Sequence, residues 1–193
     1  MMRYCFLLLA GLLVPLQGCV TPVVAAGVGA GAAAMSADAD RRTTGTIVED
    51  DSIESKAQKR IEEKYKDTAH VSVTAYNRFA LVTGSAPSED AKMDIERIVG
   101  SIPNVKGIAN ELLVGSAAAN KTSSSGDARI TANVKIRFVR SKALKADSVK
   151  VVTENSVVYL MGLVTRAEAD AASDIASTTA GVQKVVRVFE YID

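Results

Sequence analysis

Side chains that could carry out catalysis are few in this sequence, and they do not form a recognisable set. The 193 residues include one histidine, His70, and two cysteines, Cys5 and Cys19. A metal site built from several histidines and cysteines is therefore excluded by number, and no glycine-rich phosphate-binding loop is present. Carboxylates cluster at residues 49–51 and 62–63, where acid and base catalysis could be sought. Their spacing fits an acidic helix start and a solvated helix face better, so we expect no enzyme activity, cofactor, metal or small-molecule substrate.

The chemistry that the sequence indicates most clearly is lipidation of Cys19. Arg3 and the apolar run of residues 6–16 are typical of an export signal, and the run is shorter than the roughly 20 residues of a membrane-spanning helix. Residues 16–19, Leu-Gln-Gly-Cys, resemble the lipobox of bacterial lipoproteins, although Gln17 replaces the usual small or aliphatic residue. Acylation also explains why the exported chain keeps one cysteine, which cannot form an internal disulfide. The alternative is an ordinary signal peptide with a chance cysteine at its end.

The same resemblance predicts where the protein resides. Cleavage would remove the signal peptide, residues 1–18, and leave the lipid on the new N-terminus. Val20 stands where an aspartate would favour retention at the inner membrane, so the sorting rule of enteric-type bacteria implies the outer membrane, with the protein facing the periplasm. Residues 19–45 are rich in Ala, Gly and Val up to residue 37, and we expect them to form a tether. A second membrane helix is the alternative for this segment.

Beyond the tether the sequence contains two blocks, residues 46–115 and 127–193, joined by a small polar linker at residues 116–126. The blocks are copies of each other with a period near 78 residues, as three pairs of segments show: residues 71–73 with 149–151, Asn77 with Asn155, and residues 81–84 with 159–162. A period of this length indicates two copies of a small domain rather than a solenoid.

Hydrophobic periodicity predicts the order α-β-β-α-β in each copy. The first copy would contain a helix from a cap at Asp51 or Ser52 to Tyr65, a hairpin turning at residues 77–78, a helix at residues 88–99 and a strand at residues 105–114. The second would contain a helix at residues 128–146, a hairpin turning at residues 155–156, a helix at residues 166–177 and a strand at residues 182–192. Two helices covering a three-stranded sheet make an α+β sandwich, and the strand-helix-strand crossover makes the last strand parallel to its neighbour.

Two segments resemble the signature of the BON-domain family, which has a glycine after the second strand, an Ala-rich helix and a Gly-Val start to the last strand. These segments run from Gly84 to Ile108 and from Gly162 to Val185, and the first has Asn104 in place of the later glycine. Two such domains behind a lipobox resemble the dual BON-domain outer-membrane lipoproteins. The resemblance covers the chain from Cys19 to its end, and it implies a non-enzymatic protein that supports outer-membrane integrity.

The first helix of the second copy, residues 128–146, differs from its counterpart because it is strongly basic. It carries six positive residues and no acidic one: Arg129, Lys135, Arg137, Arg140, Lys142 and Lys145. On a helical wheel, Ile130, Val134 and Phe138 form one apolar face, which should pack on the sheet. Ile136 and Val139 form a second apolar strip on nearly the opposite side. That strip is exposed unless something covers it.

An apolar strip bordered by basic residues suits an anionic lipid surface. We therefore predict that an anionic phospholipid membrane is bound by Arg129, Lys135, Ile136, Val139, Arg140 and Lys142. In the lipoproteins that this chain resembles, the same helix is associated with binding of anionic phospholipid. Family members can carry an aromatic residue near the helix start, where this chain has Arg129, which implies a shallower and more electrostatic contact.

Three alternatives remain for this basic helix. The strip could pack against the negatively charged first domain, or it could bind an outer-membrane or envelope-assembly protein. It could also be an ordinary solvated face. Nucleic acid is not an expected partner, because an exported lipoprotein rarely meets it.

Overall fold

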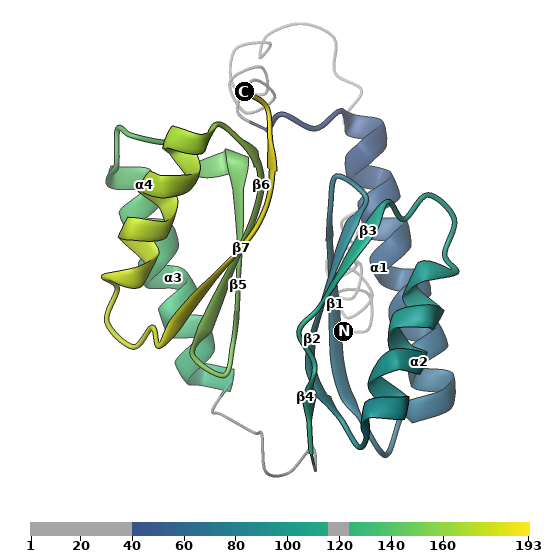
Figure 1. Ribbon diagram of the computed structural model, residues 1–193. Helices are drawn as coiled ribbons and strands as arrows, with labels where there is room; N and C mark the ends of the chain where they lie inside the picture. Colours follow the sequence, from purple (N-terminus) through teal and green to yellow (C-terminus); the bar gives the residue numbers. More distant parts are fainter. Residues whose placement is uncertain (1–39, 116–123) are drawn as a thin grey trace, which may run out of the picture.

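The computed structural model describes residues 40–115 and 124–193, which form two units with the same plan (Figure 1). The first unit contains, in order, α1 (Thr44–Tyr65), β1 (His70–Tyr76), β2 (Phe79–Ala86), α2 (Glu89–Gly100), β3 (Gly107–Asn110) and β4 (Leu113–Val114). The second contains α3 (Ser124–Arg140), the short 3-10 helix η1 (Ala146–Ser148), β5 (Val149–Glu154), β6 (Val157–Val164), α4 (Arg166–Ser177) and β7 (Lys184–Tyr191). The predicted α-β-β-α-β order is thus confirmed. The signal segment, Cys19 and linker residues 116–123 lie outside the described residues.

Both sheets have the predicted mixture of strand directions. β1 is antiparallel to β2 and β5 to β6, whereas β3 and β7 run parallel to β2 and β6. In the first unit the short strands β3 and β4 both pair with β2, β3 with its first half and β4 with its last two residues. The hairpin turns fall at Asn77-Arg78 and Asn155-Ser156, where all four residues have positive φ angles between 50° and 66°. This is the backbone of a two-residue turn that matches the twist of the flanking strands.

The first helix of each unit, α1 or α3, has other boundaries than those predicted. α1 begins about two turns earlier than Asp51, after Thr43, whose hydroxyl accepts a hydrogen bond from the Thr46 amide at 3.1 Å. The acidic cluster therefore lies within the helix rather than at its start. α3 ends at Arg140 instead of continuing to residue 146. The chain turns there, and the buried side chain of Leu144 packs into the core of the second unit.

The core of each unit lies between its helices and its sheet. Ile53, Ala57 and Ile61 of α1 are buried against the sheet, and so are Ile130, Val134 and Phe138 of α3, as their helical spacing predicted. The glycine of the family signature has a steric reason. A Cβ at Gly84 would stand 2.0 Å from the carbonyl oxygen of His70, and one at Gly162 would stand 2.4 Å from that of Ser148. Only glycine lets the two strands of each hairpin approach so closely at this point.

The two sheets face each other, and the helices lie on the outside of both (Figure 1). A third apolar cluster joins the units, and we call it the seam core: Tyr76, Leu81, Tyr159, Met161 and Leu163. β2 and β6 are consequently buried on both faces. This contact was not predicted, although the nearly continuous apolar run of β6 is typical of a strand covered on both sides. No helix in the two described ranges is long and apolar enough to cross a membrane.

Candidate membrane-binding face of helix α3

The second apolar strip of α3 is open to solvent. Ile136 is 48% exposed and Val139 is 74% exposed, whereas Val134 and Phe138 on the opposite face are buried. α3 lies on the side of the second unit that is turned away from the first unit (Figure 1). Packing of this strip against the first domain, one alternative that the sequence left open, is therefore not what the structure shows.

Three of the predicted lipid-binding cations lie on α3 beside this strip. Arg129, Lys135 and Arg140 are all exposed, and none of their side chains makes an ion pair or hydrogen bond with the residues that the structure describes. We call these three cations, together with Ile136 and Val139, the α3 outer face. It combines unpaired positive charge with apolar surface, which is the combination that an anionic membrane surface attracts.

Lys142 does not belong to the helix, contrary to the prediction. α3 ends at Arg140, and Lys142 lies in the following turn, where it is exposed. The helical wheel put Lys142 beside the apolar strip because it assumed a helix that continues to residue 146. The chain must leave the helical path at this point because Leu144 enters the core, so Lys142 is near the outer face but is not positioned by it.

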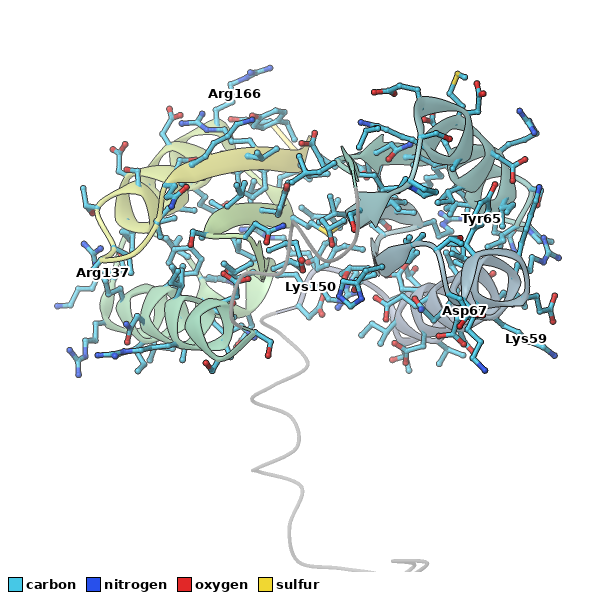
Figure 2. All side chains as sticks on the ribbon, turned by 90° about the horizontal axis from the view of Figure 1, so that it is seen from below. Lys59, Tyr65, Asp67, Arg137, Lys150 and Arg166 are labelled. Carbon is cyan, nitrogen blue, oxygen red and sulfur yellow. The ribbon has the colours of Figure 1, made fainter. Side chains whose placement is uncertain are left out.

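Arg137 has a structural role, although it lies in the middle of the basic run. Its guanidinium donates hydrogen bonds to the Ile175 carbonyl and to the hydroxyls of Thr178 and Thr179, at 2.7 to 2.9 Å. It therefore binds the C-terminal end of α4, where a positive charge is favourable; Figure 2 shows it at the outer end of the second unit. Arg60, at the equivalent place in α1, donates to Ser101 at the end of α2.

The equivalent face of α1 has a different chemistry. Superposing the repeats by their buried residues pairs Ile53 with Ile130, which puts Lys59 and Glu62 at the positions of Ile136 and Val139. Lys59 points outward from α1 in Figure 2. α1 carries six acidic and four basic residues, whereas α3 carries four basic residues and one acidic residue, Asp127, which is buried. The exposed apolar and basic character is thus special to the second unit.

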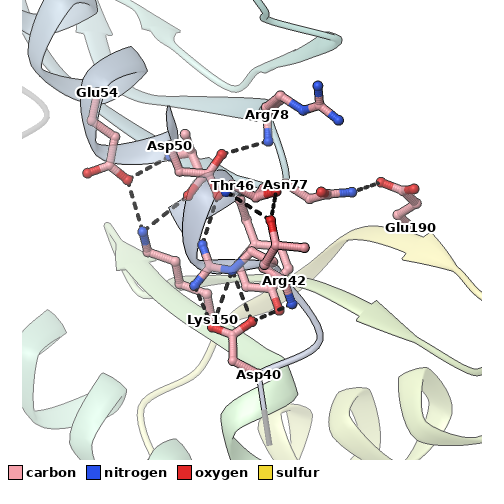
Figure 3. Close-up of polar contacts among 12 residues, drawn as sticks. Asp40, Arg42, Thr46, Asp50, Glu54, Asn77, Arg78, Lys150 and Glu190 are labelled. Carbon is pink, nitrogen blue, oxygen red and sulfur yellow. Dashed lines mark hydrogen bonds and ion pairs between the residues drawn. The ribbon is translucent and has the colours of Figure 1, made fainter. Parts of the chain in front are cut away.

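A buried aspartate holds the start of each unit to its own hairpin. The Asp50 carboxylate accepts hydrogen bonds from the backbone amides of Asn77 and Arg78 at 2.8 and 2.6 Å, and from Arg42 at 2.9 Å (Figure 3). Asp127 does the same for Asn155 and Ser156, both at 2.9 Å. The residues of the acidic cluster are therefore not all a solvated helix start. Asp50 is 1% exposed, and its two backbone contacts fix the turn.

Arg41 and Arg42, at the end of the predicted tether, are packed against the folded units. The Arg41 guanidinium forms two hydrogen bonds of 2.8 Å with the Glu168 carboxylate and one of 2.6 Å with the Leu163 carbonyl, both in the second unit. The hydrogen bonds from Arg41 lower the pKa of Glu168 to about 2. Arg42 lies over the ring of Tyr76, with its guanidinium carbon 4.0 Å from the ring centre. These contacts were missed because the seam between the units was not predicted.

A second set of polar contacts crosses the seam on the β1 and β5 side. The Lys150 ammonium donates to the Glu54 carboxylate at 2.9 Å and to the Ala75 carbonyl at 3.2 Å. Lys150 lies between the two units in Figure 2, and its bonds are drawn in Figure 3. A further bond crosses the seam on the β7 side, where Asn77 donates to Glu190 at 2.7 Å. Together with Arg41, these bonds hold the α3 outer face in a fixed orientation relative to the first unit.

The described residues contain no group of three or more histidine, cysteine or carboxylate side chains that could hold a metal ion. His70, the one histidine, is exposed at the first position of β1. Asp50, Asp127 and Glu168 all accept hydrogen bonds from backbone amides or from arginine.

Comparison with known proteins identifies the repeated unit. Residues 49–116 and 126–193 each match the BON domain family. The chain is 37% identical over 188 residues to the outer membrane lipoprotein DolP of Haemophilus influenzae, which covers 96% of this chain and 95% of the relative. It is 33% identical over 155 residues to the 21 kDa hemolysin of Actinobacillus pleuropneumoniae, covering 79% of each chain. Neither relative carries the name of an enzyme.

A solved structure of the C-terminal domain of CdsD, a structural protein of the type III secretion system of Chlamydia trachomatis, was also matched. It is 12% identical, covers 69% of this chain and 96% of that chain, and superposes with a TM-score of 0.31. No conclusion about this chain follows from so loose a superposition.

Proposed function

This chain belongs to the BON-domain family and is a dual BON-domain outer-membrane lipoprotein of the DolP type, and from that premise we propose that it binds anionic phospholipid through the α3 outer face. In doing so it supports the integrity of the outer membrane without catalysing a reaction. The observation that carries the proposal is the exposure of Ile136 and Val139 among cations with no partner in the described part of the chain. In water, exposed aliphatic side chains among unpaired cations stabilise nothing. An anionic bilayer can bury the aliphatic side chains and attract the cations.

The expected strength of this contact is modest. Burying the exposed parts of Ile136 and Val139 contributes about 1–2 kcal/mol each, and each of the three cations adds about 1 kcal/mol near an anionic surface. The sum corresponds to a dissociation constant on the order of 0.1 mM. At this affinity a free protein binds appreciably only when the lipid is in the millimolar range, whereas lipidation at Cys19 would keep the outer face near the bilayer at an effective concentration of that order. The anchor would then supply residence, and α3 would supply preference for anionic lipid.

Liposome co-sedimentation of residues 40–193, which contain both packed cores, tests the proposal. We expect binding to vesicles containing phosphatidylglycerol, little binding to pure phosphatidylcholine, and weaker binding at high salt because the charges are exposed. Ile136→Glu/Val139→Glu should abolish sedimentation with anionic vesicles. Removing the charges of Lys135 and Arg140 should weaken it, and Lys142→Gln alone should have a smaller effect because Lys142 is outside the helix.

The matched control is Val48→Glu/Met93→Glu in the first unit. These two side chains are 63% and 55% exposed, so the control introduces the same two acidic residues at two sites, on α1 and α2, that we do not expect to touch lipid. It should sediment like the wild type. Absence of wild-type binding to anionic vesicles would refute lipid recognition and leave docking to an envelope-assembly or outer-membrane protein, the alternative function, as the better account.

A further inference from the structure

The two facing sheets are closed along one pair of edges. Where β1 and β5 lie together, Lys150 bonds to Glu54 and to the Ala75 carbonyl, and the Tyr76 hydroxyl donates to the Ser148 carbonyl at 3.4 Å. The backbone amide of Ala75 is occupied as well, because it donates to Glu54 at 2.7 Å. These contacts leave little room for another chain to pair with β1 or β5.

The opposite pair of edges, formed by β3 and β7, is bridged at one end by the Asn77–Glu190 hydrogen bond and is open along the groove. A groove of about 490 Å³ lies between these strands. Most of its lining is apolar and comes from both units: Tyr76, Phe79, Ala109, Val186, Val188 and Phe189. β7 is the last strand of its sheet and is paired only with β6 over its eight residues. An edge strand of this length beside an apolar groove is a template for an additional strand.

Unpaired charges mark the two ends of the β3 wall of this groove. Lys106 precedes β3 and Glu111 follows it, both line the groove, and five residues of extended chain place them roughly 16 Å apart. Neither side chain forms an ion pair or hydrogen bond with any residue in the described ranges. By contrast, the two β7 charges that line the groove are engaged, Arg187 by Asp170 and Glu190 by Asn77.

Glu111 decides between two kinds of occupant. Its carboxylate is half-buried and lies close to the seam core, where burial first and the Glu111 charge second raise the pKa of Tyr159 to about 12. A hydrocarbon chain laid over this carboxylate would bury a charge without a partner, which is costly. A polypeptide can place a basic side chain there and can also satisfy the free backbone edge of β7.

We propose that the β3–β7 groove binds an extended segment of a partner protein, which adds to the second sheet as a strand beside β7. Its alternate apolar side chains enter the groove, an acidic residue meets Lys106, and a basic residue four positions away, on the same face of the strand, meets Glu111. This site is separate from the α3 outer face, which lies beyond the sheet on the outside of the second unit (Figure 1). The protein can therefore hold a membrane and a partner strand at the same time.

The test uses the full lipidated chain in phosphatidylcholine nanodiscs and three fluorescent ten-residue peptides of alternating valine and threonine. The peptides differ only in two charged positions four residues apart, which are Glu and Lys, Glu and Glu, or Lys and Lys. Wild type should prefer the Glu and Lys peptide. Lys106→Glu should shift the preference to the Lys and Lys peptide, and Glu111→Lys should shift it to the Glu and Glu peptide, each by roughly tenfold.

Hydrogen exchange supplies the structural readout, because an added strand should protect β7 amides, which contact by charge alone would not do. Ile136→Glu/Val139→Glu should bind the peptides like the wild type, so failure of lipid binding and failure of the groove are distinguishable. Equal affinity for all three peptides, no saturable binding, or β7 protection by palmitate but by no peptide would each overturn the proposal. The last result would make the groove an acyl-chain site.

Discussion

Asp50 and Asp127 show how one residue can connect three elements of a small domain. Each belongs to the first helix of its unit and is buried. Its carboxylate accepts hydrogen bonds from two backbone amides in the hairpin turn of the same unit. The turn residues have positive φ angles, which cost energy for residues other than glycine. The two hydrogen bonds to a charged acceptor offset this cost, and charge-assisted hydrogen bonds are among the strongest available. The repetition of this contact in both units indicates that it defines the domain.

We predict that Asp50→Ala destabilises the protein by about 3 kcal/mol, because it leaves two turn amides and the Arg42 guanidinium without their buried acceptor. Urea unfolding followed by circular dichroism measures this loss. Asp51→Ala is the control, since Asp51 is the exposed neighbour, and its unfolding free energy should stay within about 0.5 kcal/mol of the wild type. Equal effects of the two substitutions would contradict a role for the buried carboxylate.

The Arg41–Glu168 pair gives a stability that depends on pH. The pKa of Glu168 is about 2 in the folded protein and near 4.5 when unperturbed. Since the folded pKa is the lower one, the stabilisation is fully present above pH 4.5 and is lost as the pH falls from 4.5 towards 2. Arg41→Ala should therefore lower the unfolding free energy by about 2 kcal/mol at pH 7. Its difference from the wild type should shrink towards pH 2 to the part that comes from the hydrogen bond between Arg41 and the Leu163 carbonyl, and a difference that is constant with pH would exclude this mechanism.

At the scale of elements, α3 has two faces with different roles, and residues close together in its sequence belong to different faces. Arg137 and Arg140 are one helical turn apart, yet one binds the end of α4 while the other is exposed beside the apolar strip. The sequence could predict the apolar faces, because the spacing of Ile130, Val134 and Phe138 is a helical repeat. It could not assign the arginines, since a wheel shows direction but does not show which neighbouring helix end is within reach.

The two arginines should therefore respond differently to substitution. Arg137→Ala should reduce the unfolding free energy by about 1–2 kcal/mol through loss of its hydrogen bonds and should leave the affinity of the folded protein for anionic vesicles nearly unchanged. Arg140→Ala should leave stability unchanged and weaken vesicle binding by roughly fivefold, equivalent to about 1 kcal/mol. Thermal unfolding and co-sedimentation of the two variants in parallel check this, and a reversed pattern would place the lipid contact elsewhere.

Element order and strand direction were predictable because they follow from local patterns and from the geometry of crossovers. The residues at which the helices begin and end were less predictable. Asp51 looked like a helix start because acidic residues favour that position, but α1 begins at Thr44. The helix at residues 128–146 looked continuous because Leu144 lies near the edge of its apolar face. In the structure Leu144 reaches the core from a turn, which no periodicity distinguishes from a helix.

At the scale of the whole molecule, the facing sheets turn two small domains into one body. The seam core of Tyr76, Leu81, Tyr159, Met161 and Leu163 is flanked by the Arg41 and Lys150 contacts. The repeat in the sequence reveals two domains, but their mutual orientation depends on contacts between residues far apart in the chain. This is why the seam, the groove beside it and the packing of Arg41 could not be derived from the pattern of either copy alone.

Opening the seam should change the shape of the molecule without unfolding its units. Leu81→Asp buries an unpaired carboxylate between the sheets, so the units should separate, and small-angle scattering should record a larger radius of gyration while circular dichroism stays close to that of the wild type. Val48→Asp, at an exposed site on α1, is the control and should scatter like the wild type. An unchanged radius for Leu81→Asp would show that the polar contacts alone hold the units together.

The central claim, that the α3 outer face contacts anionic lipid while the protein is anchored, is tested most directly by spin labels on the full lipidated chain in nanodiscs. A label at position 139 should become accessible to oxygen and protected from a water-soluble nickel reagent when phosphatidylglycerol is present, and a label at position 48 should remain exposed to nickel. Equal nickel exposure of both labels in anionic and neutral nanodiscs would contradict the account.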